Sequence, residues 1–208
     1  MSAPALHPEL LAFDRDLRQR FGTLCGVDEA GRGPLAGPVC AAAVVLPEGY
    51  LPEGLNDSKK LTEKRRELLF DEIRENAVAY SVQLVDNEII DDINILNATM
   101  QAMAQAIAGL GVPVELALID GNRCPPANLP CQAVVQGDAR SASIAAASIL
   151  AKVTRDRLML EYDQLFPGYG FARHKGYPTK AHYQALTELG VTPIHRLTFL
   201  KKWKGRSQ

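Results

Sequence analysis

One stretch of the chain, residues 26–39, constrains the fold more than any other, because it reads GVDEAGRGPLAGPV. The apolar run at 23–27 predicts a buried strand that ends on two adjacent carboxylates, Asp28 and Glu29. Neighbouring residues of a strand point to opposite faces, so we expect the two acids to share a site only if the strand breaks at Glu29. Three glycines and two prolines follow and predict a turn whose backbone can approach a ligand closely. A second strand is expected at 39–46.

The same stretch has two other interpretations. The pattern Gly31-x-Gly33-x-x-Ala36 after a strand resembles a dinucleotide-binding fingerprint, which requires a helix to begin at the glycines. Gly37-Pro38 interrupts any such helix within a turn, and the following sequence is strand-like, so this interpretation is disfavoured. An ordinary hairpin with solvated acids remains the simplest alternative for the segment taken alone.

The composition is typical of a globular protein. With 208 residues, 47% hydrophobic and 23% charged, we expect one domain over 1–208, with a core at about 20–165 and a C-terminal helical segment at about 166–208. An apolar run of about 18 residues is lacking, as is a cationic start before an apolar core, so we expect no membrane span, no signal peptide and a cytoplasmic location. Nothing suggests an obligate oligomer, and a monomer is expected.

The four cysteines and the distribution of charge indicate which kinds of site and partner the protein can have. The cysteines occur singly, without a CxxC pair, which favours reduced thiols over a zinc or redox site; a Cys124–Cys131 disulfide is the weaker alternative. The net charge of −1 divides into −9 for residues 1–139 and +8 for residues 140–208. This asymmetry suggests an anionic partner held by one side, although for charge alone chance clustering on solvated helix faces is the favoured explanation.

Hydrophobic periodicity predicts a mixed sheet with helices on both faces, an α/β fold. Helices are expected at 8–20, 62–76, 86–92, 94–109, 141–165 and 179–189, and further strands at 79–85, 114–119 and 132–136. Residues 168–178 are expected to form a loop rich in glycine, aromatic and basic residues.

Four acids stand at or just beyond predicted strand ends: Asp28, Glu29, Asp120 and Asp138. In open α/β sheets, ligands bind outside the carboxyl ends of the strands. Several ionised carboxylates cannot lie together unless cations are present or their pKa values rise. Oxygen-only ligands favour Mg²⁺ or Mn²⁺, and two such ions about 3.5–4 Å apart would suit phosphoryl transfer in nucleases and polymerases. Taken singly, Asp120 and Asp138 could instead be turn formers or helix caps.

Five motifs, in order and with family-like spacing, resemble ribonuclease HII of the bacterial type. They are the stretch 26–39, DSKKL at 57–61, IDG at 119–121, the segment 137–156 that begins GD and ends AKVTRD, and HKGYPTK at 174–180. The resemblance covers about residues 20–200 and implies a ribonuclease H-like fold with a five-stranded mixed sheet. It implies an endonuclease that cuts the RNA strand of RNA/DNA hybrids. It also implies cutting 5′ of single ribonucleotides in duplex DNA, the first step of ribonucleotide excision repair.

The resemblance also assigns residues to roles. The catalytic and metal-binding acids are Asp28, Glu29, Asp120 and Asp138, holding Mn²⁺ or Mg²⁺, with two ions during catalysis. The substrate loop is Gly31, Arg32 and Gly33, and the ribonucleotide-sensing residue is Tyr177. Further substrate contacts, mainly to phosphates, are expected from Lys59, Lys60, Ser141, Lys152, Arg155, Lys175 and Lys180. Outside its motif Tyr177 would more often be a packing residue, and any single lysine simply solvated.

The expected partners are RNA/DNA hybrids and ribonucleotide-containing duplex DNA, cut to 3′-hydroxyl and 5′-phosphate ends. A catalytically silent hybrid-binding module is one alternative, although it would have no need of four clustered acids. The related ribonuclease HIII type is another; it usually carries a large N-terminal substrate domain, and only about 20 residues precede Thr23 here. His174, His182 and His195 show no spacing typical of a site and are expected to be structural. The role of the basic tail from His195 is left open.

Overall fold

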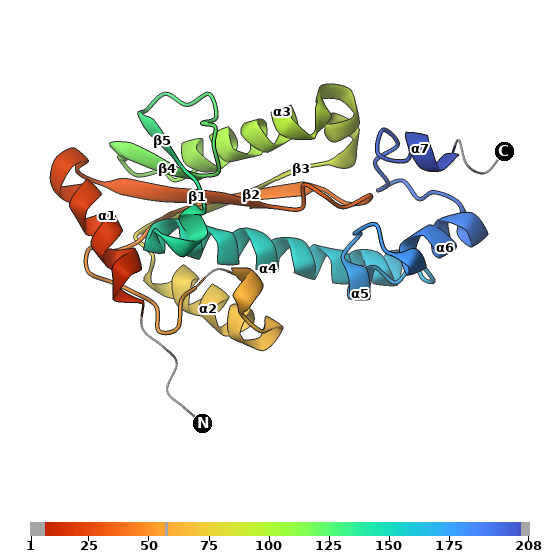
Figure 1. The fold of residues 1–208 in the computed structure, drawn as a ribbon, viewed down its shortest axis with the longest axis horizontal. Helices are drawn as coiled ribbons and strands as arrows, with labels where there is room; N and C mark the ends of the chain where they lie inside the picture. The colour runs from red at the N-terminus through yellow and green to blue at the C-terminus, as the bar shows by residue number, and fades with distance from the viewer. Residues whose placement is uncertain (1–6, 57, 205–208) are drawn as a thin grey trace.

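The computed structural model describes residues 7–56 and 58–204, in which one five-stranded sheet is covered by helices on both faces (Figure 1). The strands are β1 (Leu24–Ala30), β2 (Val39–Val45), β3 (Ala79–Val85), β4 (Leu116–Asp120) and β5 (Cys131–Val134). The helices are α1 (Pro8–Phe21), α2 (Glu63–Asn76), α3 (Asn87–Ala108), α4 (Ala142–Leu165), α5 (Phe171–His174), α6 (Lys180–Leu189) and α7 (Lys201–Lys204), with short 3-10 turns η1 (Ser58–Lys60) and η2 (Gly137–Ala139).

The sheet is mixed, as the sequence predicts. Its strand order is β3-β2-β1-β4-β5, with antiparallel pairing of β1 to β2 and of β2 to β3, and parallel pairing of β1 to β4 and of β4 to β5. Helix α3 covers one face, and α4 with α2 covers the other (Figure 1). Because β1, β4 and β5 run in parallel, their carboxyl ends lie at one edge, where a ligand site is expected.

Two local predictions need correction. The first strand does not break at Glu29: β1 continues to Ala30, because Glu29 and Ala30 pair with Ala41 and Cys40 of β2. The predicted loop at 168–178 contains the short helix α5. The two helices predicted at 86–92 and 94–109 are confirmed as the two parts of α3, which meet at a kink at Asn94, whose φ of 67° and ψ of 162° are not helical.

The close packing of α4 on β1 follows from small side chains. The first half of α4 is rich in buried alanine and serine, so its backbone can approach the sheet. At the contact, β1 carries Gly26, where an added Cβ would lie 2.0 Å from the carbonyl carbon of Ser143. Asp14 of α1 completes this region by accepting hydrogen bonds from the Ser143 backbone N–H and hydroxyl, at 2.8 and 2.7 Å.

The loop between β1 and β2, residues 31–38, is built into the C-terminal part of the chain. Ala36 forms an isolated antiparallel bridge with His195, and the Gly37 N–H donates to the Ile194 carbonyl at 2.9 Å. On its other side, the Leu35 N–H donates to the Gly176 carbonyl at 2.8 Å. Figure 1 shows the tip of this hairpin beside the C-terminal helices.

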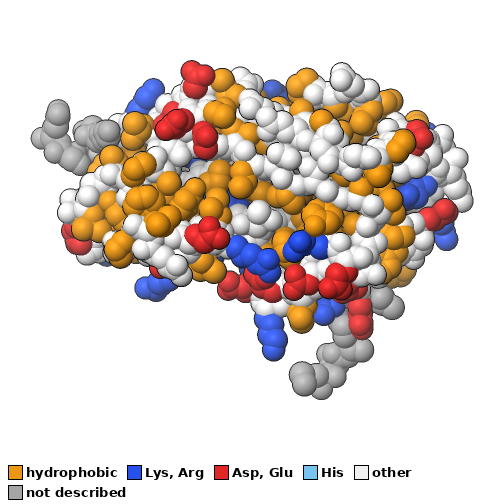
Figure 2. All heavy atoms as spheres, turned by 180° about the vertical axis from the view of Figure 1, so that it is seen from behind, with side chains coloured by type: hydrophobic (Ala, Val, Ile, Leu, Met, Phe, Trp, Pro, Cys, Tyr) orange, Lys and Arg blue, Asp and Glu red, His pale blue; other side chains and the backbone are white. Residues whose placement is uncertain are grey.

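The surface, the cysteines and the helices test three further predictions, which concern the charge division, a disulfide and a membrane span. Figure 2 shows the face opposite to that of Figure 1, where an apolar band runs along the molecule and acidic and basic side chains lie beside one another below it. The charge division along the sequence therefore does not produce a single basic surface on that face. All four cysteines are free, which excludes the Cys124–Cys131 disulfide in this structure. Of the helices in the described ranges, none has the length and apolar character needed to cross a membrane.

Replacing Gly26 with alanine should destabilise the fold strongly, because the new Cβ would overlap the α4 backbone, which cannot rotate away as a side chain could. We expect a loss of about 3 kcal/mol in the free energy of unfolding, measured by urea denaturation. Gly33→Ala is the matched control, since its Cβ would meet nothing closer than 3.5 Å and its stability should be near wild type. Equal stability of the two variants would contradict this account of the helix–sheet contact.

Candidate active site

Asp28 and Glu29 lie on opposite faces of β1, yet both reach the same edge of the sheet. Asp28, 4% exposed, faces α4, two residues beyond Gly26. Glu29 faces α3 and lines a cavity of about 220 Å³ together with Arg32 and Asp120. Strand β4 ends at Asp120, and its pairing with β1 ends at Val27 and Ile119, so Asp28 lies level with Asp120 and Glu29 extends one residue past the end of β4. The end of the shorter neighbouring strand, and not a break in β1, therefore opens this part of β1 to one site.

Asp120 and Asp138 join this site from the neighbouring parallel strands. Asp120 is the last residue of β4, and its Oδ1 accepts a hydrogen bond from the Gly137 N–H at 2.6 Å. Gln136, with φ of 54°, turns the chain after β5 into η2, which carries the buried Asp138. The Lys59 ammonium lies 3.4 Å from the Asp138 carboxylate. The structure thus brings the four predicted acids to the carboxyl ends of β1, β4 and β5.

The acids strongly influence one another. Burial raises the pKa of Asp28 well above its usual range, and repulsion from Glu29 and Asp120 adds to it, against hydrogen bonds from the Glu29 N–H and the Ser148 hydroxyl. Burial also raises the pKa of Glu29; the nearby Arg32 lowers it and Asp120 raises it again. The Arg32–Glu29 contact measures 3.5 Å between Nη1 and Oε1. A buried acid and a half-buried one, both held near further carboxylates, favour either protonation or a bound cation.

The donor set fits a hard divalent cation. Its groups are carboxylate oxygens from four acids, and no thiolate or imidazole accompanies them in the described contacts. Within residues 7–56 and 58–204, however, no three His, Cys, Asp or Glu side chains are already arranged around one ion position. Instead Asp28, Asp120 and Asp138 each bond to a protein group. A carboxylate has about four acceptor sites on its two oxygens, so these bonds do not by themselves exclude a cation.

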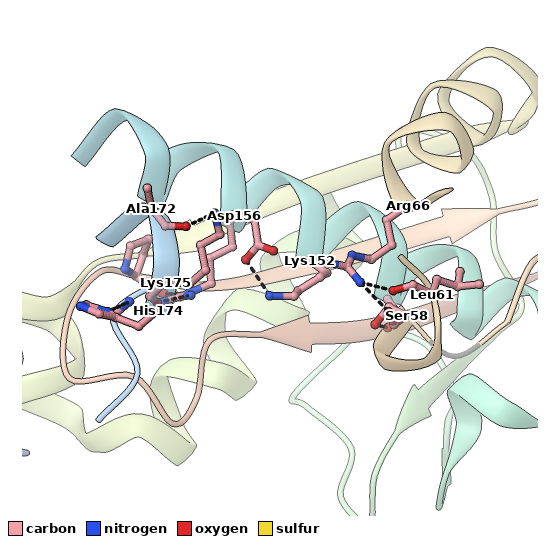
Figure 3. A network of polar contacts seen from close by, with 12 residues as sticks. Ser58, Leu61, Arg66, Lys152, Asp156, Ala172, His174 and Lys175 are labelled. Carbon is pink, nitrogen blue, oxygen red and sulfur yellow. Dashed lines mark hydrogen bonds and ion pairs between the residues drawn. The ribbon is translucent and has the colours of Figure 1, made fainter. Parts of the chain in front are cut away.

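Basic residues of the predicted motifs lie along α4 and the two segments beside it (Figure 3). Arg66 of α2 donates to the Ser58 and Leu61 carbonyls at 3.1 and 2.6 Å, which fixes the η1 turn that carries Lys59 and the exposed Lys60. Lys152 of α4 donates to Asp156 at 2.7 Å, and burial lowers the pKa of its ammonium.

At the other end of α4, Lys175 has φ of 49°, and its ammonium donates to the Ala172 carbonyl at 2.7 Å. Lys180 is exposed at the start of α6.

Arg155 and Ser141, which were expected to contact substrate, are buried inside the protein. Arg155 is 1% exposed, and its guanidinium donates to the carbonyls of Ala36, Pro38 and Lys175. Ser141 is fully buried and caps α4, its Oγ accepting from the Ile144 N–H at 3.2 Å. Neither side chain reaches the surface, so both shape the site from inside instead of touching phosphates.

Gly33 and Tyr177, far apart in sequence, lie together. A Cβ at Gly33 would be 3.5 Å from Tyr177 Cε1, so the ring packs directly over the glycine. Tyr177 is 41% exposed, and Arg32 and Gly33 are exposed beside it. Gly31, with φ of +95°, has no room for a side chain, because a Cβ would lie 2.1 Å from the Arg155 guanidinium. The backbone of the 31–38 loop and the ring of Tyr177 therefore lie at one surface.

Beneath Tyr177, three histidines form an internal network. The Thr192 N–H donates to His195 Nδ1 at 2.8 Å, so a neutral His195 carries its proton on Nε2 and donates it to His182 Nε2 at 3.0 Å. His182 then donates from Nδ1 to the Tyr177 carbonyl at 3.0 Å. His174 stacks on His182 with ring centroids 4.5 Å apart. The prediction that these histidines are structural agrees with this arrangement.

Two sets of residues were not found from the sequence. Ser58 and Ser148 hydrogen bond through their hydroxyls at 2.8 Å, and Ser148 also supports Asp28. Both serines lie inside recognised motifs, so that signal was available. Arg196 is fully buried against the 31–38 loop, and nothing in the spacing of the tail distinguishes it from its basic neighbours.

A mixed α/β sheet with four acids at the ends of its parallel strands defines the class of ribonuclease H-like proteins. A crystal structure of ribonuclease H2 from Pyrococcus horikoshii OT3 matches with a TM-score of 0.69 at 28% identity, covering 85% of this chain and 93% of that one. The family model of ribonuclease HII matches residues 25–202.

Named sequence relatives agree with the family match. Ribonuclease HII of Dechloromonas aromatica is 58% identical over 178 residues, 86% of this chain and 91% of the relative. That of Ruminiclostridium cellulolyticum is 52% identical over 196 residues, 94% of this chain and 77% of the relative. The chain belongs to the ribonuclease HII family, whose members are ribonuclease H endonucleases dependent on divalent metal. The ribonuclease HIII alternative is not supported by these relatives.

The histidine network should make stability depend on pH. Burial lowers the pKa of both His182 and His195 from 6.5 to about 4. The unfolded chain therefore binds more protons between pH 6.5 and 4, so each histidine's contribution is complete above about pH 6.5 and is lost as pH falls. Each should lower the unfolding free energy by up to about 1.4 kcal/mol per pH unit in that window.

The measurement compares wild type with His182→Gln by urea denaturation at pH 7 and pH 5. We expect wild type to be the more stable at pH 7, and the difference to shrink at pH 5. Asp28 and Glu29, whose pKa values are raised, change the unfolding free energy with pH in the opposite direction to the histidines. Because both acids are present in wild type and variant, their contribution cancels in the comparison. A difference that stays constant with pH would show that the network does not titrate on unfolding.

Proposed function

We propose that this protein cuts the RNA strand of RNA/DNA hybrids, and cuts duplex DNA on the 5′ side of a single embedded ribonucleotide. The observation that carries the proposal is the gathering of Asp28, Glu29, Asp120 and Asp138 at one sheet edge, a short distance along β1 from the 31–38 loop. The acids supply the reaction centre, and the loop with Tyr177 supplies recognition. Family membership gives the reaction class, while these residue roles are our assignment.

The four carboxylates would hold Mn²⁺ or Mg²⁺, two ions during the reaction. When bound, such ions would acidify a water and neutralise charge on the leaving oxygen, and the products would then carry 3′-hydroxyl and 5′-phosphate ends. Asp28 is held in place by the Glu29 N–H at 2.7 Å and by the Ser148 hydroxyl, and Asp120 by the Gly137 N–H. These bonds would hold the carboxylates in orientation beside one another despite their repulsion.

Recognition of the ribonucleotide falls to the exposed backbone of Arg32 and Gly33 and to the ring of Tyr177. The 2′-hydroxyl distinguishes RNA from DNA, and a glycine permits main-chain groups to approach it without a side-chain clash. The tyrosine ring can pack on the sugar. Lys59, Lys60, Lys175 and Lys180 would contact phosphates, with Lys152 contributing if its pair with Asp156 opens, and such contacts are sensitive to salt and indifferent to sequence.

A catalytically silent hybrid-binding module is the alternative of a different class. Burial of Asp28 beside other acids costs free energy that binding alone does not require, which favours catalysis. Incubation of the protein with a labelled hybrid and Mn²⁺ distinguishes the two, because intact substrate would favour the silent module. Full cleavage in the presence of EDTA would contradict the metal-dependent reaction.

Replacing Asp28 with asparagine should abolish cleavage while stabilising the metal-free protein, because a buried charge repelled by Glu29 and Asp120 is removed. The melting temperature should rise by about 2–4 °C for each kcal/mol of repulsion relieved. Added Mn²⁺ should raise the melting temperature of wild type and raise that of the variant less. Differential scanning calorimetry and a cleavage assay on one preparation give both readouts.

Asp14→Asn is the matched control, because Asp14 is also buried on the α4 side of the sheet but supports the start of α4 away from the other acids. It should keep its cleavage activity and its Mn²⁺-induced stabilisation. An Asp28→Asn protein that still cuts would remove this carboxylate from the reaction.

Tyr177→Ala should reduce cutting at a single embedded ribonucleotide by about tenfold more than cutting of a long hybrid, a difference of about 1.4 kcal/mol. The reason is that a lone ribonucleotide offers one sugar to recognise, whereas a long hybrid offers many registers. Single-turnover rates on the two substrates provide the measurement, with Tyr80→Ala, a partly exposed tyrosine on β3, as control. Equal losses on both substrates would indicate a packing role for Tyr177.

A further inference from the structure

Arg196 is buried in an unusual way for a cation. It is 0% exposed, and within residues 7–56 and 58–204 it forms no ion pair with a carboxylate; Asp91, which acts on it electrostatically, accepts hydrogen bonds from Leu197 and Thr198 instead. Burial lowers its pKa to about 9, so it still carries its charge at neutral pH. A buried charge without a counterion is costly unless hydrogen bonds satisfy it, so its partners need an explanation.

Those partners are three carbonyl groups of one loop. The Arg196 guanidinium donates to the carbonyls of Gly31 at 2.7 Å, Arg32 at 3.0 Å and Gly37 at 2.9 Å. Arg155 supports the other end, donating to Ala36 and Pro38. The two guanidiniums thus bind five carbonyls of the segment 31–38, and they do so from the interior of the molecule.

The direction of these carbonyls decides what the loop presents outside. In a trans peptide the C=O of one residue and the N–H of the next point in opposite directions. With the carbonyls of Gly31 and Arg32 turned inward to Arg196, the N–H groups of Arg32 and Gly33 are turned away from it. Both residues are exposed, and the Tyr177 ring lies 3.5 Å from the Cβ position of Gly33. Two backbone donors therefore face the surface on which the ring lies.

We propose that Arg196 is a positioning residue for ribonucleotide recognition, which sets the direction of the Arg32 and Gly33 amides by holding the carbonyls of Gly31, Arg32 and Gly37. This inference rests on the proposed function, since it concerns how the same loop reads a 2′-hydroxyl. Arg196 itself does not touch the nucleic acid. Its loss allows the peptide planes to rotate, which weakens discrimination between ribose and deoxyribose more than it weakens overall affinity.

A second contact of the same segment acts in the same direction. His195, next to Arg196, bridges to Ala36 and through His182 holds the carbonyl of Tyr177. The residues 195–196 consequently hold both parts of the recognition surface, the loop and the ring, in one arrangement. The guanidinium of Arg196 thus binds backbone carbonyls inside the protein, whereas the side chain of an exposed tail lysine faces solvent.

The test measures binding in EDTA, so that no cleavage occurs, by fluorescence anisotropy on two duplexes. One duplex carries a single ribonucleotide, and the other is the same sequence in DNA only. The variants are Arg196→Lys, which keeps the charge but loses the forked donor geometry, and Arg196→Met, which keeps much of the volume and loses both. Arg18→Met is the matched control, because Arg18 also donates to a buried backbone carbonyl, that of Leu46 at 2.8 Å.

We expect the preference of wild type for the ribonucleotide duplex to fall about tenfold in Arg196→Met and by less in Arg196→Lys, while affinity for the DNA duplex changes less than about twofold. Arg18→Met should lose stability with an unchanged preference. Melting curves establish that each variant is folded at the assay temperature. Amide hydrogen exchange of residues 31–38 should accelerate in both Arg196 variants and not in Arg18→Met.

The outcomes separate the inference from the function on which it rests. A folded Arg196→Met protein with the wild-type preference overturns the positioning role, and so does an equal loss of affinity for both duplexes. A wild type that does not prefer the ribonucleotide duplex overturns recognition by the loop itself. If Arg196→Met does not fold, Arg196→Lys with the wild-type preference and wild-type hydrogen exchange overturns the proposal.

Discussion

The contact between Gly26 of β1 and the start of α4 is the constraint on which the rest of the structure depends. It allows the helix backbone to lie against the strand, which places Ser148 within reach of Asp28 and the turn before the helix, with Asp138, beside the end of β4. A larger residue at this point would separate the helix from the strand. The acids of β1, β4 and η2 would then no longer meet.

The four-acid site brings like charges together, and the surrounding protein offsets their repulsion. Arg32 lies beside Glu29, Lys59 beside Asp138, and backbone N–H groups bond to Asp28 and Asp120. These partners keep the carboxylates in place without removing their preference for a cation. Within residues 7–56 and 58–204, no three of these side chains are already arranged around one ion position.

The sequence predicts the sheet and its acids well because those features depend on local patterns. Apolar runs, the glycine-rich turn and Asp-Gly or Gly-Asp pairs at strand ends each show in a few consecutive residues. The continuation of β1 through Glu29 could not be predicted, since it depends on pairing with β2 while β4 stops early. The interior positions of Arg155 and Arg196 could not be predicted either. The sequence does not distinguish a buried arginine that binds carbonyls from an exposed arginine that binds phosphate.

The linkage between the 31–38 loop and Arg196 joins residues 165 positions apart. Contacts of such long sequence separation form late in folding, because a large loop of chain must close before they gain any free energy. During synthesis, the sheet and its acids can therefore assemble well before the final segment emerges. The 31–38 loop would be held in place only when residues 195–196 have joined it, so under the proposed function the newly made core would carry its reaction centre before it gained its selectivity.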